Sequence, residues 1–289
     1  MATIKSLTRK IRALKNTRKI TKAMKMIAFT RFRRAHKALG DSRAYGEEMG
    51  RLVSRLLPAA ETPHPLTLPA PRPSGKILIA AFTSERGLCG ALNTNMLLSL
   101  VPFLSERLAK GVAVTFLNCG RKGNEFFKRK KIAVQIENEP PLKKITPAGA
   151  RGLADRLARE YAEGKWDEVW VVWTECHSIV RLTPTLERLL PVSLKAGGEP
   201  AAGASMLLEP DADTVLDGAI RDAVRTRVFG CYLGENASEH AARMTAMENA
   251  TNNATVLIDH TTLVRNRMRQ AAITRELIEI ISGVESMKD

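Results

Sequence analysis

Hydrophobic residues recur at alternating intervals of three and four near the N-terminus, the spacing of a helix that packs along one face. This heptad pattern runs from Ile4 to Leu14 and resumes in the same register from Ala28 to Leu39. The polar residues that interrupt it are Arg18, Thr21 and Lys25. Because no proline precedes Pro58, the pattern predicts one long helix over residues 1–57.

A second heptad pattern runs through the C-terminal part, where no proline follows Pro210. Its positions are Met247, Ala250, Ala254, Leu257, Thr261, Val264, Met268, Ala271, Arg275 and Ile278. Most of these side chains are small, polar or flexible, so this face holds a partner weakly. A helix over residues 211–289 would be ~118 Å long at 1.5 Å per residue. Two such ends favour an antiparallel coiled coil, with an ordinary helical bundle as the alternative.

Between the two ends, short apolar runs alternate with helix-like stretches. The predicted strands are 76–82, 112–118, 132–137 and 168–174, with further strand-like pieces at 181–192 and 204–210, and the predicted helices are 93–110, 121–130 and 147–163. This alternation is typical of a mainly parallel sheet covered on both faces. We therefore expect a Pro-rich linker over 58–75 and a central doubly wound, Rossmann-like α/β domain over 76–210, between the terminal helices 1–57 and 211–289.

Charge is concentrated at the N-terminus. The chain of 289 residues carries a net charge of +15, yet residues 1–39 hold 13 Lys or Arg and no carboxylate, whereas residues 211–289 hold 9 basic and 12 acidic residues. Such an arm suggests a nucleic-acid-binding protein or an organellar transit peptide, which both remain alternatives at this point. No apolar run approaches the roughly 20 residues of a membrane helix.

Signatures of catalysis and of metal binding are missing from the sequence. The four cysteines form no CxxC pair and the five histidines have no ligand spacing, so we expect no disulfide framework, metal or cofactor. The loop Ser84–Asn95 follows the first strand, but Gly87 and Gly90 give GxxG, which is neither a dinucleotide fingerprint nor a P-loop. We interpret both glycines as parts of a structural turn. An independent nucleotide-dependent enzyme is a weaker alternative.

Three runs of sequence carry a family resemblance. They are IKSLTRKIRALKNTRKITKAMKMIA near the N-terminus, SERGLCGALNTN after the first strand, and SEHAARMTAMENATNNATVLIDHTTLVRNRMRQAAITRELIEIISG near the C-terminus. In this order they resemble the gamma subunit of F-type ATP synthases, over the whole chain and in its bacterial form. The resemblance implies a non-catalytic central rotor shaft that couples ion translocation through the membrane sector to ATP synthesis or hydrolysis at the beta subunits.

The resemblance also implies partners and a location. These are the alpha and beta subunits of the catalytic hexamer, the epsilon subunit and the ring of c subunits, with no direct binding of nucleotide or nucleic acid. The complex would hold the chain peripherally at the cytoplasmic face of the bacterial inner membrane. Because the family's mature sequence begins with the same helix, a transit peptide is not expected. The alternative function that remains is a basic nucleic-acid-binding protein.

Individual positions are carried over from the family's motifs. Those that resemble beta-subunit contact and coupling positions are Lys22, Met24, Lys25, Arg243, Gln270, Thr274 and Glu276. A weaker match, MLLEP, resembles the loop that meets the c ring and includes Met206, Leu207 and Leu208. Met24 and Arg243 are expected to lie near one another, which would place Ile11 near Leu257, within about one turn. The plainer interpretation of Met24 is a packing residue, and that of Arg243 and Gln270 is a solvated helix face.

Overall fold

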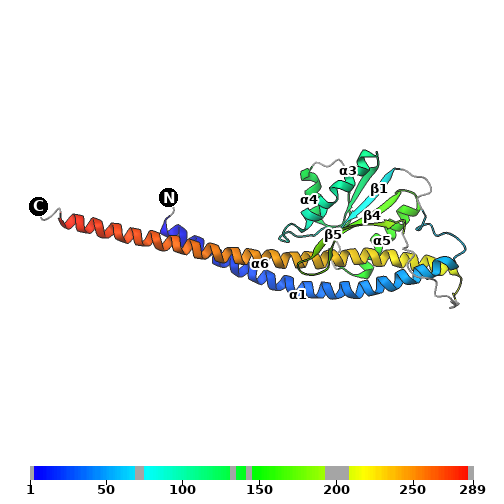
Figure 1. Cartoon of the computed structure of the whole chain (residues 1–289), viewed down its shortest axis with the longest axis horizontal. Helices are drawn as coiled ribbons and strands as arrows, with labels where there is room; N and C mark the ends of the chain where they lie inside the picture. Colours follow the sequence, from blue (N-terminus) through cyan, green and yellow to red (C-terminus); the bar gives the residue numbers. More distant parts are fainter. Residues whose placement is uncertain (1–2, 69–74, 131–134, 141–144, 193–207, 286–289) are drawn as a thin grey trace. The chain divides into compact units, whose positions relative to one another are not determined.

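A computed structural model describes residues 3–68, 75–130, 135–140, 145–192 and 208–285 (Figure 1). Its two longest elements are the terminal helices α1, Ile4–Leu56, and α6, Ala212–Glu285. The chain divides into two compact units, and each unit contains a part of both helices. Unit 1 consists of Met1–Ala28 and Arg243–Asp289, and unit 2 consists of Phe29–Ala242.

In unit 1, α1 packs through the face that the heptad pattern predicts. Leu7, Ile11, Thr21 and Ala28 are buried, while the intervening positions of the same heptads are half-buried. Thr21 and Thr251 share a hydrogen bond of 2.7 Å between their hydroxyl oxygens. Two of the polar residues that interrupt the pattern, Thr21 and Lys25, therefore stay on the packed face and bond polar residues of α6.

The packed face of α6 differs from its prediction in one of its two rows. Met247, Ala254 and Thr261 are buried as expected, but Leu257 is 47% exposed, and its neighbour Ile258 is buried instead. Ala271, Arg275 and Ile278 are exposed as well. The prediction was wrong by one residue at Leu257, where the contact between Thr21 and Thr251 fixes a register that buries Ile258. Ala250 and Val264 of the same predicted row are half-buried.

Unit 2 is built on a five-stranded sheet with the order β3-β2-β1-β4-β5. The strands are β1, Lys76–Ala81; β2, Ala113–Asn118; β3, Gln135–Asn138; β4, Glu168–Cys176; and β5, Leu182–Leu190. The first four are parallel and β5 is antiparallel to β4. β1 is central and buried on both faces, as the continuous apolar run predicted.

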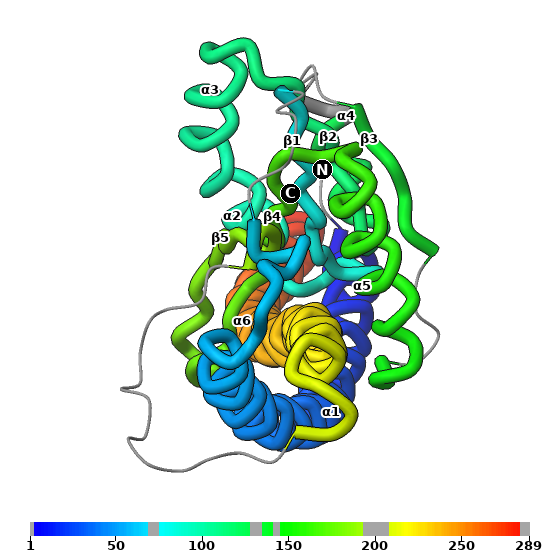
Figure 2. Tube along the Cα trace, turned by 90° about the vertical axis from the view of Figure 1, so that its right-hand side faces the viewer, coloured from blue at the N-terminus to red at the C-terminus, as the bar shows by residue number. Residues whose placement is uncertain are grey.

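Helices cover both faces of the sheet (Figures 1 and 2). They are α2, Leu92–Ser99; α3, Val101–Ala109; α4, Arg121–Lys130; and α5, Pro147–Ala162, with a 3-10 turn at Leu57–Ala59. Along β1, Leu78 and Ala80 belong to the core under α5 and α6, while Ile77 and Ile79 belong to the core under the other helices. The predicted fold class, terminal helices joined to a doubly wound α/β domain, is confirmed.

The terminal helices also take part in the core of the α/β domain. Val53 and Leu56 of α1, and Leu216 and Ile220 of α6, are buried in the same cluster as Leu78. A second cluster joins the two helices to each other and to the end of β4, through side chains that include Phe32, Leu233 and Cys176. The residue ranges given above for separate domains stay a prediction about chain organisation.

Candidate partner-binding surfaces

The first candidate surface is the basic face of α1 in unit 1. Its exposed cations are Lys5, Arg9, Lys10, Arg12, Lys15, Lys19 and Lys22, and Arg18 and Lys25 lie where it borders the packed face. Among the described residues, the structure pairs Lys25 of this set with a carboxylate, Glu248 of α6, at 2.6 Å. Arg18 and Lys25 are half-buried and the others are exposed. Like charges on one helix face repel one another, so this surface favours an acidic partner.

The coupling positions carried over from the family lie at different places along unit 1. Lys22 is exposed and Met24 is half-buried on α1; Arg243 is half-buried on α6. Gln270, Thr274 and Glu276 are exposed. Facing residues of α1 and α6 have numbers that add to 272 or 273, as in the pairs Thr21 with Thr251 and Lys25 with Glu248. These three residues of α6 therefore lie level with the start of α1 or beyond it.

The same register tests the two expected pairs of neighbours, and it corrects the pair Met24 and Arg243. The position that faces Met24 is near Glu248, so Arg243 lies about five residues further along α6, or ~8 Å. Ile11 is buried opposite the buried Thr261, and Leu257 lies about one turn away with its side chain exposed. The family motif placed both pairs only approximately, because a motif does not specify the stagger between two helices.

The residues matched to the c-ring loop are only partly visible. Met206 and Leu207 lie outside the described residues. Leu208 is half-buried and packs against the core that contains Leu56 and Leu216. A packing role accounts for this leucine, and its contact with a partner stays a prediction.

The loop between β1 and α2 is held by side-chain hydrogen bonds. The backbone N–H of Ser84 donates to Asn93 Oδ1 at 2.9 Å, and Asn93 Nδ2 donates to Ser84 Oγ at 2.7 Å. Gly90 has φ +61°, where glycine avoids the steric cost of a side chain, while Leu88 adopts φ +65° despite that cost. Gly87 has no such conformation. The Ser84–Asn93 pair was missed, although a polar residue at each end of a turn is its signal.

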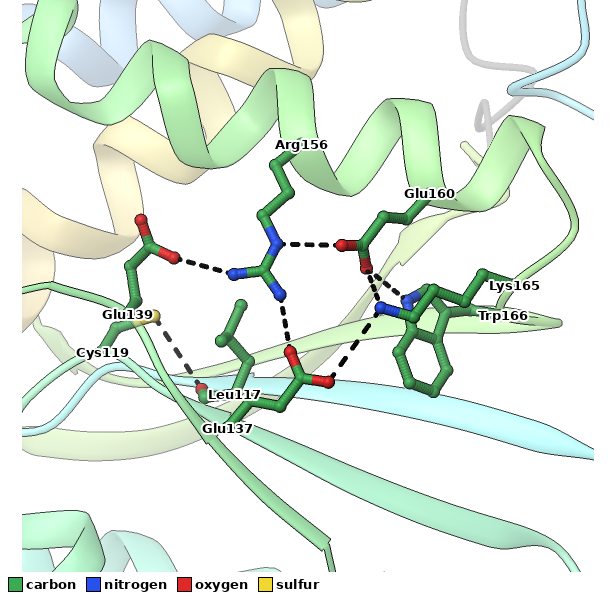
Figure 3. A network of polar contacts seen from close by, with 8 residues as sticks. All are labelled: Leu117, Cys119, Glu137, Glu139, Arg156, Glu160, Lys165 and Trp166. Carbon is green, nitrogen blue, oxygen red and sulfur yellow. Dashed lines mark hydrogen bonds and ion pairs between the residues drawn. The ribbon is translucent and has the colours of Figure 1, made fainter.

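An ionic network joins α5 to the edge of the sheet (Figure 3). Arg156 binds Glu137 at 2.6 Å, Glu139 at 3.1 Å and Glu160 at 2.9 Å. The hydrogen bond with Glu160 is the main cause that raises the Arg156 pKa above its ordinary value. Burial opposes ionisation of Glu160, but hydrogen bonds from Trp166, Arg156 and Lys165 together lower its pKa. The network holds the short strand β3 against α5. We interpret it as structural support, because its charged groups are engaged in these ion pairs.

A buried carboxylic acid attaches α6 to β4. Glu235 Oε2 accepts a hydrogen bond from the backbone N–H of Thr174 at 3.0 Å, and Ser238 Oγ donates to the Thr174 carbonyl at 2.7 Å. Burial raises the Glu235 pKa to about 8, so the side chain is mostly neutral at pH 7. Glu235 was not among the predicted site residues, because a glutamate in a long helix usually lies on a solvated face.

Within the described residues, no group of three or more His, Cys, Asp or Glu side chains has an arrangement that could hold a metal ion. No described helix combines the length and the apolar character needed to cross a membrane.

The fold defines a class of protein in which two long terminal helices join a doubly wound α/β domain. A solved structure of the Euglena gracilis mitochondrial ATP synthase rotor has a TM-score of 0.63 and 20% identity, covering 93% of this chain and 98% of its own. A central stalk and c-ring structure of the Tetrahymena thermophila mitochondrial ATP synthase has a TM-score of 0.57 and 22% identity, covering 80% of this chain and 99% of its own. These likenesses concern the fold.

The sequence gives the particular family. A family model described as ATP synthase matches residues 3–287. The ATP synthase gamma chain of Geobacter sp. (strain M21) is 38% identical over 288 residues, covering 100% of both chains. The chain belongs to the family of ATP synthase gamma chains, as its motifs predicted.

Proposed function

We propose that the chain is the central rotor shaft of an F-type ATP synthase and couples ion translocation to ATP synthesis or hydrolysis on other subunits. Membership of the gamma chain family over the full length carries this proposal. A gamma chain is a non-catalytic subunit of the complex. Its contribution is mechanical, which agrees with the great length of the two terminal helices.

The partners follow from the same role. The shaft would stand within a hexamer of alpha and beta subunits and would meet the epsilon subunit and the c ring at its α/β domain. The solved Tetrahymena thermophila structure comprises a central stalk and a c-ring, which supports the last of these contacts for that relative. We place the complex at the cytoplasmic face of the bacterial inner membrane, and the bacterial source of relatives such as that of Geobacter sp. supports a bacterial complex.

The basic face of α1 would act as a surface that slides past acidic loops of the beta subunits. An exposed ion pair contributes about 0 to 1 kcal/mol, so many weak contacts are exchanged easily during a turn. A deeply buried pair would instead resist separation, because breaking it leaves an unpaired charge. Lys22, Met24 and Lys25 would lie at this contact, together with Arg243. Gln270, Thr274 and Glu276 would contact the hexamer from the exposed end of α6.

Copurification tests the proposed assembly. A tagged chain, produced with the other subunits from the same bacterium, is expected to bring down alpha and beta subunits in salt-washed preparations. Binding of nucleic acid without these subunits, lost as salt is raised, would instead support the alternative of a nucleic-acid-binding protein. Removal of the tagged chain's residues 1–25 gives the control, because it deletes the basic face and leaves unit 2 complete.

Charge reversal tests how the basic face works. Reversing Lys15, Lys19 and Lys22 together is expected to reduce ATP-driven ion pumping severalfold in inverted vesicles, while each single change has little effect. Each exposed contact is weak and screened within about 8 Å at physiological ionic strength. A single Lys→Ala variant that assembles normally but abolishes ATP turnover would contradict the distributed contact.

A further inference from the structure

A cavity of about 560 Å³ lies in unit 2 at the carboxyl ends of β1 and β2. Phe82 and Thr83, which follow β1, and Cys119, which follows β2, line it from the sheet. Helices α1 and α6 supply other walls. In doubly wound folds, the crevice outside the carboxyl ends of the strands is where ligands bind, and the volume suits a small molecule.

Three arginines line this cavity without a carboxylate partner among the described residues. Arg31 and Arg34 come from neighbouring positions on one side of α1, and Arg86 comes from the loop after β1. By contrast, Arg156 and Arg225 of unit 2 each bind two or more carboxylates. Three unpaired guanidinium groups around one cavity create a positive potential, and a multivalent anion bound there would neutralise it.

The carboxylates in the same cavity do not cancel this charge at neutral pH. Glu85 and Glu239 also line it, and Glu239 takes part in a contact of its own. The third, Glu235, is buried beside Thr174 and is mostly neutral below pH 8. At pH 7 the three arginines therefore exceed the two ionised carboxylates.

The floor of the cavity is apolar. Phe82 and Tyr232 meet edge to face with ring centroids 4.7 Å apart, and Ala35 and Leu233 are buried beside them. A ligand with an apolar body could rest on this floor while its anionic group meets the guanidinium groups.

We propose that this cavity binds a small multivalent oxyanion of the phosphate class, held by Arg31, Arg34 and Arg86. This site is distinct from the loop that contains Gly87 and Gly90. No direct nucleotide binding was predicted for that loop, because its glycines do not form a phosphate loop. The groups proposed to bind the anion are side chains around the neighbouring cavity. The proposal does not depend on the rotor function, since a shaft works with the cavity empty or filled.

Glu235 makes the affinity depend on pH. Its ionisation would place a negative charge at the wall of the cavity and oppose the anion. The titratable and charged groups that face it are Arg31 and Arg34 on α1, Glu85, Arg86 and Cys119 at the sheet edge, and Tyr232, Glu239 and His240 on α6. We expect affinity to fall as the pH rises through about 8.

Calorimetric titration of the full chain tests the site, with pyrophosphate and ADP as separate probes at constant ionic strength and without metal. Saturable binding with a dissociation constant below about 1 mM is expected at pH 7. Arg34→Ala should weaken it roughly tenfold or more, because a charge-assisted contact is lost. The matched control is Arg33→Ala, which removes the same charge from the adjacent residue of α1. Arg33 is exposed, as Arg34 is, but it does not line the cavity.

The two probes separate the sources of affinity. Tighter binding of ADP than of pyrophosphate would show that the apolar floor contributes, and equal binding would assign the affinity to the phosphates alone. Equal losses in Arg33→Ala and Arg34→Ala would overturn the proposal, because the anion would then be sensing only the general charge of the helix. Absence of saturation with both probes at millimolar concentration would overturn it as well.

The variant Glu235→Gln tests the pH dependence. It should bind at pH 7 like the original chain and lose much less affinity between pH 7 and 9.5. Comparing the two proteins at each pH cancels the titration of the probe itself. The same loss in both proteins would show that Glu235 does not control the site.

Discussion

Glu235 is a buried carboxylic acid, with 5% of its surface exposed. Its pKa is raised by burial from 4.5 to about 8, so the folded protein binds this proton more tightly than the unfolded chain. The contribution to the free energy of unfolding is complete below pH 4.5 and is lost as the pH rises to about 8. The loss is on the order of 4 kcal/mol, because one pKa unit corresponds to about 1.4 kcal/mol.

We therefore expect Glu235→Gln to be more stable than the original chain at pH 8, by a few kcal/mol, and to differ much less at pH 4.5. The amide cannot ionise, and its oxygen can still accept from the Thr174 N–H. Urea unfolding of both proteins at several pH values measures the difference. A stability gap that stays constant from pH 4.5 to 8 would show that Glu235 ionises freely in the folded state.

Gly120 lies where the backbone of one loop touches another. A Cβ at this position would be 1.9 Å from the Thr83 carbonyl oxygen, a contact that no side chain can accept. Gly120→Ala is expected to lower the free energy of unfolding by several kcal/mol, because the backbone after β1 must move. Thermal unfolding of the full chain measures the change.

The control for this prediction is Gly40→Ala on α1. Nothing lies within 4 Å of a Cβ built there, and the residue is exposed in a helix. Alanine should raise stability by up to about 1 kcal/mol, through its higher helix propensity. If both substitutions had the same effect, the close approach at Gly120 would not be the cause.

The strands and helices of the α/β part could be predicted because their hydrophobic patterns are strong. The run Lys76–Phe82 is continuously apolar, and β1 covers Lys76–Ala81. The stretch 93–110 was expected as one helix, but two helices meet at Leu100, next to Pro102. Proline allows a helix to begin there while it prevents an unbroken one. Hydrophobic periodicity does not record such a break, although Pro102 marks it in the sequence.

The heptad face of α6 shows the limit of periodicity. Leu257 and Ile258 are adjacent apolar residues, so either could join the row through Ala254 and Thr261. The partner decides between them, since Thr21 of α1 bonds Thr251 and fixes the stagger. The sequence of one helix contains no record of that contact. For the same reason the family motif alone placed Arg243 too close to Met24.

The end of α6 extends past its partner. Leu277, Ile278, Ile280 and Ile281 are 53–63% exposed, and the register leaves them beyond the level of Ile4. In the free chain we expect fast hydrogen exchange for amides from about Ile273 onward, because a helix without packing partners is marginal in water. Amides of β1 should exchange far more slowly. Equal protection of both segments in the free chain would contradict partner-dependent order.

Short sequence motifs indicated the family of the whole chain, whereas the candidate sites are formed by the packing of distant segments. KITKAM, RGLCG and ARMTAM pointed to the gamma chain family without any knowledge of the fold. The cavity beside Arg34 and the acid Glu235 could not be found that way, because they join α1, the sheet edge and α6 across more than 200 residues. Whether the coupling residues act as the resemblance implies stays a prediction.

A rotor shaft must turn as one body, and the contact between Thr21 and Thr251 allows a direct test. Their hydroxyl oxygens are 2.7 Å apart, so cysteines at both positions would bring two sulfurs close enough to bond. The four native cysteines are buried and free, which limits competing disulfides. In the assembled complex, oxidation of Thr21→Cys/Thr251→Cys is expected to leave ATP hydrolysis largely intact, because the bond joins parts that move together.

The contrasting variant carries Lys22→Cys, joined by a disulfide to a cysteine placed in the acidic loop of a beta subunit. This bond should stop ATP hydrolysis until a reductant is added, because it ties the turning part to the stationary one. Turnover before and after reduction is compared with the cross-link yield on a gel, and each single cysteine variant serves as a control. If the bond within the shaft blocked turnover at high yield and reduction restored it, α1 and α6 would have to slide or separate during each cycle. The shaft would then transmit force by deforming along its packed face, and the small, polar residues of that face would be the feature that permits it.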